Sequence, residues 1–196
     1  MINQAYKTML YLVSILMIAQ ILLLPKEVVS AEISLPKGQM LYLRTDLFAG
    51  LLNDMPEYSS IAAGLGYAGH AGWRSNRWGV FVGFERDFWV THNWQIKVTP
   101  GVLNILAGGE YLSFNKKIRT SIAAGTSSLM FDSVFDERGS TGLYIDIRPS
   151  SLRWTLNDKL TIEFCPISVS FMNPVMGKRP IKKLEYRSYL TIEASL

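Results

Sequence analysis

Apolar and polar side chains alternate with a period of two along most of the chain after residue 40. Such alternation is typical of β-strands that have one apolar and one polar face. It is clearest at the C-terminal end, where Leu190 and Ile192 share one face and Arg187 and Glu193 share the other. The pattern therefore predicts an all-β protein that ends in an amphipathic strand.

Two predicted strands change the phase of their alternation midway. Between residues 141 and 156 the change falls at Pro149, and between residues 159 and 173 it falls at Pro166. Proline cannot donate a hydrogen bond to the ladder and is tolerated at bulges, where one extra residue reverses the facing of those that follow. We therefore predict a β-bulge near each proline.

The two faces of the predicted strands differ in kind. One face carries bulky apolar residues, and the other carries charges or small residues such as Gly64 and Gly66. The charged residues on this second face are Arg44, Asp46, Glu85, Asp87, Arg119, Asp146, Arg148, Glu163, Glu185, Arg187 and Glu193. So many charges would be very unfavourable in a dry core, whereas in a polar lumen they can pair.

This polarity predicts an antiparallel up-and-down transmembrane β-barrel whose bulky apolar face meets lipid. A soluble lipocalin-like barrel, apolar inside and polar outside, is the alternative fold. We expect eight strands, because bacterial single-chain barrels have even numbers and a split of residues 94–114 at Pro100 would give nine. Ten strands are the alternative. The eight predicted strands span residues 40–52, 58–71, 77–90, 94–114, 118–131, 141–156, 159–173 and 184–196.

The connections between these strands alternate in character. Those after the second, fourth and sixth strands are short and cover residues 72–76, 115–117 and 157–158. The other connections cover residues 53–57, 91–93, 132–140 and 174–180, of which the last two are long. Short turns are typical of the periplasmic side and longer loops of the outside. Both termini of the barrel domain are therefore predicted to lie in the periplasm.

The N-terminal segment, residues 1–31, has the features of a secretory signal peptide. Lys7 precedes an apolar run over residues 9–24, and Val29-Ser30-Ala31 supplies the small residues of a cleavage site. Cleavage before Glu32 would leave residues 32–196 as the barrel domain. An uncleaved membrane anchor is the alternative, although the run of 16 residues is shorter than the about 20 that span a bilayer. Export predicts the outer membrane of a Gram-negative bacterium as the location.

Composition agrees with a membrane barrel. Hydrophobic residues make up 48% of the chain and aromatic residues 12%, and membrane barrels use aromatic residues as interfacial girdles. The net charge is +4, and the basic residues are spread out rather than gathered into a nucleic-acid patch. Cys165 is the single cysteine, which excludes an intrachain disulfide. The partners expected are outer-membrane lipids and the outer-membrane assembly machinery, with the barrel as a monomer.

Several motifs in the C-terminal half resemble a group of uncharacterised outer-membrane β-barrel proteins of Gram-negative bacteria. They are Arg119-Thr120-Ser121, Phe131-Asp132, residues 139–142, Arg148-Pro149, Leu152-Arg153-Trp154, Pro166, Pro174, Pro180 and Tyr186-Arg187-Ser188. The resemblance implies the same fold and location, and it implies no activity. Leu196 departs from the phenylalanine common at the end of such barrels, but it keeps the terminus apolar.

The sequence predicts no catalytic, cofactor or metal site. Gly64-Leu65-Gly66 lies in a predicted strand with no following helix, so it is no dinucleotide-binding motif. His92 lies in a predicted outer connection beside Trp89 and Trp94, where it could imitate a lipid-modifying hydrolase; an exposed loop histidine is the simpler interpretation. A His92→Ala variant that leaves lipid A modification unchanged would exclude that hydrolase role.

Two candidate functional regions follow. The first is a lumen charge network of Arg44, Asp46, Glu85, Arg119, Asp146, Arg148, Glu185 and Arg187, which either fills a narrow barrel as a paired plug or lines a water-filled pore. The second is the external loop at residues 132–140, whose candidate contact residues are Asp132, Phe135, Asp136, Glu137 and Arg138. We expect a structural or surface-binding role without chemistry. A narrow solute pore and a lipid A-active hydrolase or acyltransferase are the alternatives.

Overall fold

The computed structural model describes the chain from Pro36 to Leu196 with five gaps, and the predicted signal peptide lies outside the described residues. The gaps fall at residues 56–60, 93–95, 130–139, 177–178 and 181. Among the described residues, no helix is long and apolar enough to cross a membrane. The strands are β1 (Gln39–Met55), β2 (Ile61–Ser75), β3 (Trp78–His92), β4 (Ile96–Ser113), β5 (Ile118–Leu129), β6 (Ser140–Thr155), β7 (Leu160–Met176), β8 (Arg179–Pro180) and β9 (Lys182–Ser195).

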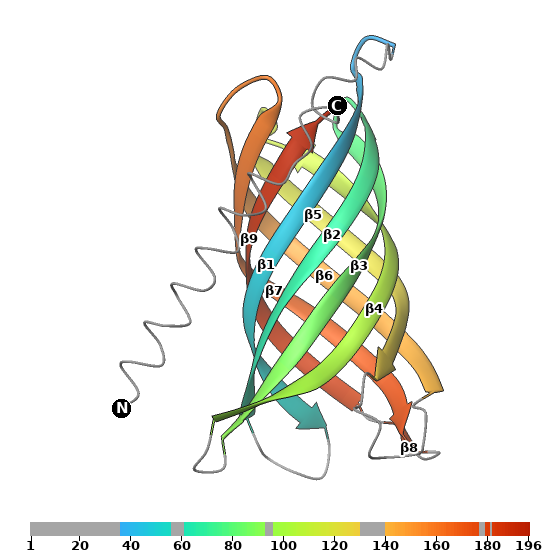
Figure 1. Ribbon diagram of the computed structural model, residues 1–196. Helices are drawn as coiled ribbons and strands as arrows, with labels where there is room; N and C mark the ends of the chain where they lie inside the picture. Colours follow the sequence, from blue (N-terminus) through green and yellow to red (C-terminus); the bar gives the residue numbers. More distant parts are fainter. Residues whose placement is uncertain (1–35, 56–60, 93–95, 130–139, 177–178, 181) are drawn as a thin grey trace. The chain divides into compact units, whose positions relative to one another are not determined.

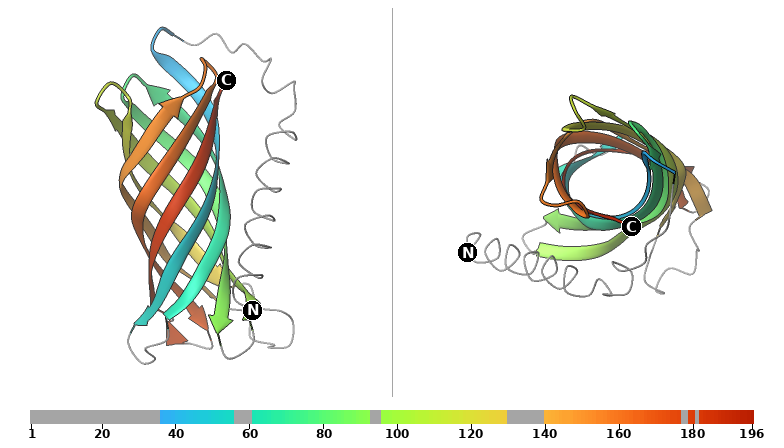
Figure 2. Two further views of the ribbon diagram at one scale, coloured as in Figure 1. Left: turned by 90° about the vertical axis from the view of Figure 1, so that its left-hand side faces the viewer. Right: turned by 90° about the horizontal axis from the view of Figure 1, so that it is seen from above.

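The strands form a closed antiparallel barrel. Strands β1 to β7 each pair with the next along the chain, and β9 pairs with both β7 and β1. Figure 1 shows β1 beside β9, and the view from above in Figure 2 shows the resulting ring. The two-residue β8 only extends the end of β7. The described residues therefore contain eight full strands, as predicted, and the ten-strand alternative is wrong.

The barrel has two distinct ends. At the turn end, β1 begins and β9 ends, and the turns cover residues 76–77, 114–117 and 156–159. At the loop end, the strands are joined through the segments that contain the gaps. The turn after β2 is shorter than the predicted 72–76, because β2 continues to Ser75 and pairs with Trp78. Similarly, β1 and β3 run on into the predicted outer connections, to Met55 and His92.

Both predicted bulges are present. The β5–β6 ladder shifts register where Ser121 pairs with Arg148 but Arg119 pairs with Ser151, so that β6 has one extra residue beside Pro149. The β7–β9 ladder shifts between Cys165 and Ser168, around Pro166. Each extra residue reverses the inward and outward alternation of the residues that follow it. As a result, the polar side chains on both sides of each bulge in β6 and β7 face the inside of the barrel. Residues 96–113 form one strand, with a register shift beside Pro100.

Glycines on the inner face give space to large neighbours across the strands. Gly72 of β2 pairs with Tyr42, and a Cβ at Gly72 would overlap the Tyr42 ring. Gly66 stands in the same relationship to Phe48, and both aromatic rings are buried. An eight-stranded barrel has an interior only wide enough to be filled by side chains. The packing of the lumen therefore depends on aromatic rings that occupy the space left by the glycines.

Candidate functional site

The outer surface of the barrel is apolar. Val82 and Ile105 each have 60% of their surface exposed, and Ile105 lies in the middle of β4. Near the turn end the exposed residues become aromatic, with Trp73, Trp78 and Trp154. An apolar band bordered by aromatic residues is the surface of a barrel that lies in a bilayer.

The lumen, by contrast, is charged. All eight residues of the predicted lumen charge network lie inside the barrel and are buried. The other charged residues that were predicted to face inward, Asp87, Glu163 and Glu193, are also buried there. Among the described residues, six buried arginines and Lys183 face eight buried carboxylates, so the charges almost balance. Buried charges are tolerated when they are paired and hydrogen-bonded, and the ion pairs below link the six arginines to the carboxylates.

A turn-end cluster gathers four arginines and three glutamates. Its members are Arg44, Arg74, Arg119, Arg153, Glu110, Glu163 and Glu193. Arg74 donates to both carboxylate oxygens of Glu193, at 2.9 and 2.8 Å, and its Nε donates to Glu110 at 2.7 Å. Arg153 bridges Glu163 and Glu193 at 2.6 and 2.7 Å. Strands from all around the barrel are tied together at this end.

A loop-end cluster is built around Arg187 of β9. The guanidinium contacts Glu85 and Glu185 at 2.5 Å each and Asp87 at 3.5 Å. Glu85 also accepts hydrogen bonds from the Tyr144 hydroxyl at 2.9 Å and from the Asn104 amide at 3.0 Å. Charge-assisted bonds of this kind are among the stronger hydrogen bonds in proteins.

Asp46 connects the two clusters. It accepts from Arg148 at 2.5 Å and from the Thr191 hydroxyl at 2.9 Å, and its carboxylate lies 3.4 Å from Arg44. His70 of β2 is buried and lies 3.1 Å from the same carboxylate. Arg148 in turn lies 4.0 Å from Glu85. A continuous chain of ion pairs therefore runs along the lumen from the turn-end cluster to the loop-end cluster.

Aromatic rings fill the spaces beside the guanidinium groups. Arg148 stacks over Tyr189 with 3.7 Å from Cζ to the ring centroid, and Arg187 lies 4.6 Å from the centroid of Phe48. Arg74 lies 4.5 Å from the ring of Tyr42. Such cation–π contacts are stronger in a desolvated setting, and here they also exclude water from the ion pairs.

The pairing differs in part from the expected set. Arg187 contacts Glu85 and Glu185, both of which were predicted members. Arg119 contacts Glu163 at 2.8 Å and otherwise lies near Glu110 and Glu193, which are outside the predicted network.

Sequence reasoning missed three members of the turn-end cluster. Arg74 fell in the predicted turn, and the glycine-rich strand around Glu110 gave no clear alternation. The inward facing of Arg153 could have been found, because Leu152 and Trp154 mark the outer face after Pro149.

The second candidate region lies outside the described residues. Asp132, Phe135, Asp136, Glu137 and Arg138 all fall within the gap at residues 130–139. His92 is the last residue of β3, paired with Ile96, rather than part of a connection as predicted.

Three solved structures of outer-membrane proteins are similar to this chain. Neisserial surface protein A matches with a TM-score of 0.53 and 15% sequence identity, over 79% of this chain and 98% of that protein. Ail, the attachment invasion locus protein of Yersinia pestis, solved with the heparin analogue sucrose octasulfate, gives 0.46 and 13%, over 80% and 99%. An outer membrane channel from Pseudomonas putida F1 gives 0.32 and 8%, over 83% and 97%. No protein-family model and no curated protein sequence matches the chain.

The match to Neisserial surface protein A shows the fold. Together with the apolar outer band and the charged lumen, it identifies the chain as a small outer-membrane β-barrel. This is the fold that the resemblance in the C-terminal half implied, and the soluble lipocalin-like alternative is wrong, because the polarity of the two faces is the reverse of a soluble barrel.

Proposed function

We propose that this chain is a closed outer-membrane scaffold, plugged by its own lumen charges, with a structural or surface-binding role. One observation carries the proposal: the side chains of Arg44, Asp46, Glu85 and Arg187 have no exposed surface. Side chains that line a water-filled pore would be exposed to that water. The paired plug is therefore favoured over the solute pore.

A closed barrel can act at its ends rather than through its centre. Its contact surface would be formed by the loop-end connections, among which residues 132–140 combine Phe135 with charged neighbours. Loops held by a rigid scaffold carry binding sites more often than the scaffold does. The ion-pair chain would then serve to keep that scaffold rigid.

Conductance in planar lipid bilayers tests the plug. We expect the purified barrel to give no current steps, and a variant with Arg44→Ala, Arg148→Ala and Arg187→Ala to conduct, because it removes the centre of the network. Arg77→Ala, an exposed change at a turn, is the matched control. A heat-modifiability gel establishes that each protein is folded. Reproducible current steps from the unmodified barrel would overturn the plug in favour of the pore.

A further inference from the structure

An open groove of about 1190 Å³ lies on the outer wall of the barrel, across β2 to β6 near the turn end. Its floor is at Gly109 of β4, which pairs with Val80 of β3 and Ile122 of β5. A Cβ at Gly109 would meet only a backbone oxygen, at 3.8 Å, so the space above this glycine is open. Val80 and Ile122, each 57% exposed, form the two walls. This part of the groove is an apolar slot of the kind that a hydrocarbon chain can occupy.

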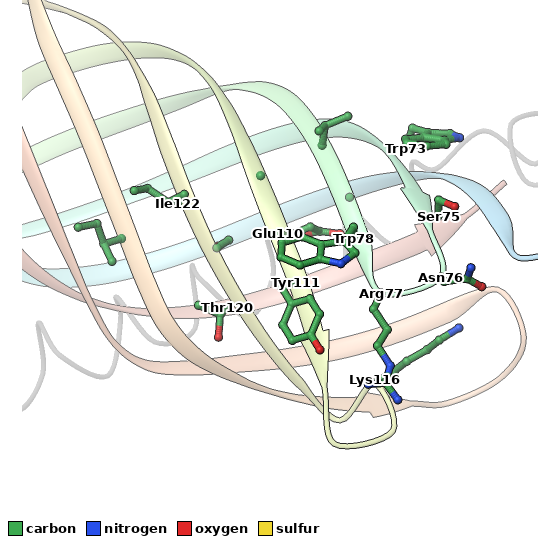
Figure 3. A pocket seen from close by; sticks show the side chains of 15 residues that line it. Trp73, Ser75, Asn76, Arg77, Trp78, Glu110, Tyr111, Lys116, Thr120 and Ile122 are labelled. Atoms are coloured by element: carbon green, nitrogen blue, oxygen red, sulfur yellow. The ribbon is translucent and has the colours of Figure 1, made fainter.

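The groove becomes aromatic and then basic toward the turn end. Trp78, which is 69% exposed, lies against Tyr111 with 4.6 Å between ring centroids. Beyond these rings, Arg77 and Lys116 come from two neighbouring turns, and both line the turn-end part of the groove (Figure 3). Aromatic residues favour the level of the lipid headgroups, and basic residues at that level attract anionic lipids.

Both basic residues sit on turns that are held in place. The Arg77 carbonyl accepts a hydrogen bond from the amide of Leu112 at 2.8 Å. The Lys116 carbonyl accepts one from the guanidinium of Arg153, a member of the turn-end cluster, at 3.2 Å. The two cations are thus presented by fixed backbone next to the aromatic pair.

We propose that this groove binds one anionic phospholipid, with its phosphate between Arg77 and Lys116 and one acyl chain over Gly109. Charge complementarity selects an anionic headgroup, and the slot between Val80 and Ile122 selects a lipid rather than free phosphate. The turn end carries the short turns, which are a periplasmic feature of such barrels, so the lipid comes from the phospholipid leaflet. The inference rests on the outer-membrane location in the proposed function, but not on the plug.

Native mass spectrometry of the folded full barrel in detergent tests the site, with phosphatidylglycerol and phosphatidylcholine added at equal concentration. We expect one phosphatidylglycerol to be retained in preference. The double variant Arg77→Gln/Lys116→Gln should lower its apparent affinity at least about tenfold, because each cation near a headgroup contributes substantially. Lys159→Gln, at the remaining turn and outside the groove, is the matched control and should leave binding unchanged.

A second pair of variants tests the acyl slot. A Cβ at Gly109 meets open space, so Gly109→Leu places an apolar side chain in the slot and should reduce retention, whereas Ala124→Leu, on the exposed face of β5 outside the groove, should not. Equal retention of both lipids by every variant would overturn the site. Preference for lipid A that is lost in Arg77→Gln/Lys116→Gln would overturn the phospholipid assignment. A heat-modifiability gel separates these outcomes from failure of the barrel itself.

Discussion

Arg74 of β2 holds both carboxylate oxygens of Glu193 of β9, and the two residues are 119 positions apart in the chain. Strand β1 lies between these two strands, so the contact spans a neighbour on the inside of the barrel. Because the ion pair is buried, removal of either residue would leave the charge of the other without a partner, at a large cost in folding free energy.

Replacement of Arg74 by alanine should therefore strongly destabilise the barrel. It leaves Glu110 and Glu193 with fewer partners in a dry lumen, and the loss of one member of a buried pair costs about 3–5 kcal/mol. Equilibrium unfolding in urea, from detergent micelles without phospholipid, measures the change. Arg77→Ala, an exposed arginine three residues further on, should lie within about 0.5 kcal/mol of the unmodified protein. Similar effects of the two changes would contradict the pairing.

Overpacking at Gly72 gives a second prediction. Gly72→Ala forces a methyl group into the Tyr42 ring and should cost about 1–3 kcal/mol. In a Tyr42→Ala background the same change should cost much less, and a double-mutant cycle measures this coupling. Gly109→Ala, which enters open space, is the control and should be close to neutral. Additive effects at Gly72 and Tyr42 would show that the ring does not occupy this space.

Depth in the membrane governs a third prediction. Ile105 faces outward near the middle of β4, whereas Ile192 lies three residues from the end of β9. An arginine on the lipid face costs about 2–4 kcal/mol at the midplane and about 0–1 kcal/mol near the interface. Ile105→Arg should therefore destabilise the barrel more than Ile192→Arg in urea unfolding from vesicles. If Ile192→Arg destabilised the barrel more than Ile105→Arg, the membrane midplane would lie closer to Ile192 than to Ile105.

Single-residue deletions test the bulges. Deletion of Pro149 removes the extra residue of β6 and leaves Arg148 and Ser151 both facing inward, so the barrel should still fold. Deletion of Ala123 from the regular part of β5 reverses every side chain on one side of it and should prevent folding. The two proteins are compared by heat modifiability after refolding. If the Ala123 deletion variant folded, the barrel would tolerate reversed side chains on β5, and the inward facing of the buried charges would not be needed for folding.

The facing of residues along the strands could be predicted, because it depends on local alternation and on the contrast between lipid and a polar interior. The phase changes at Pro149 and Pro166 were visible for the same reason. The partners of Arg119 were not, because they depend on register and on strands far apart in the sequence. The groove over Gly109 could not be predicted from the sequence either, because its outward-facing residues become neighbours only when β3, β4 and β5 pair.

The ion-pair chain in the lumen also bears on how the barrel assembles. Arg74 with Glu193, Asp46 with Arg148 and Glu85 with Arg187 each join residues about 100 positions apart or more. Contacts between such distant segments form late, after the entropy of closing long loops has been overcome. An open sheet with its last strands missing would hold unmatched charges, so we expect closure to be all-or-none and reopening to be slow.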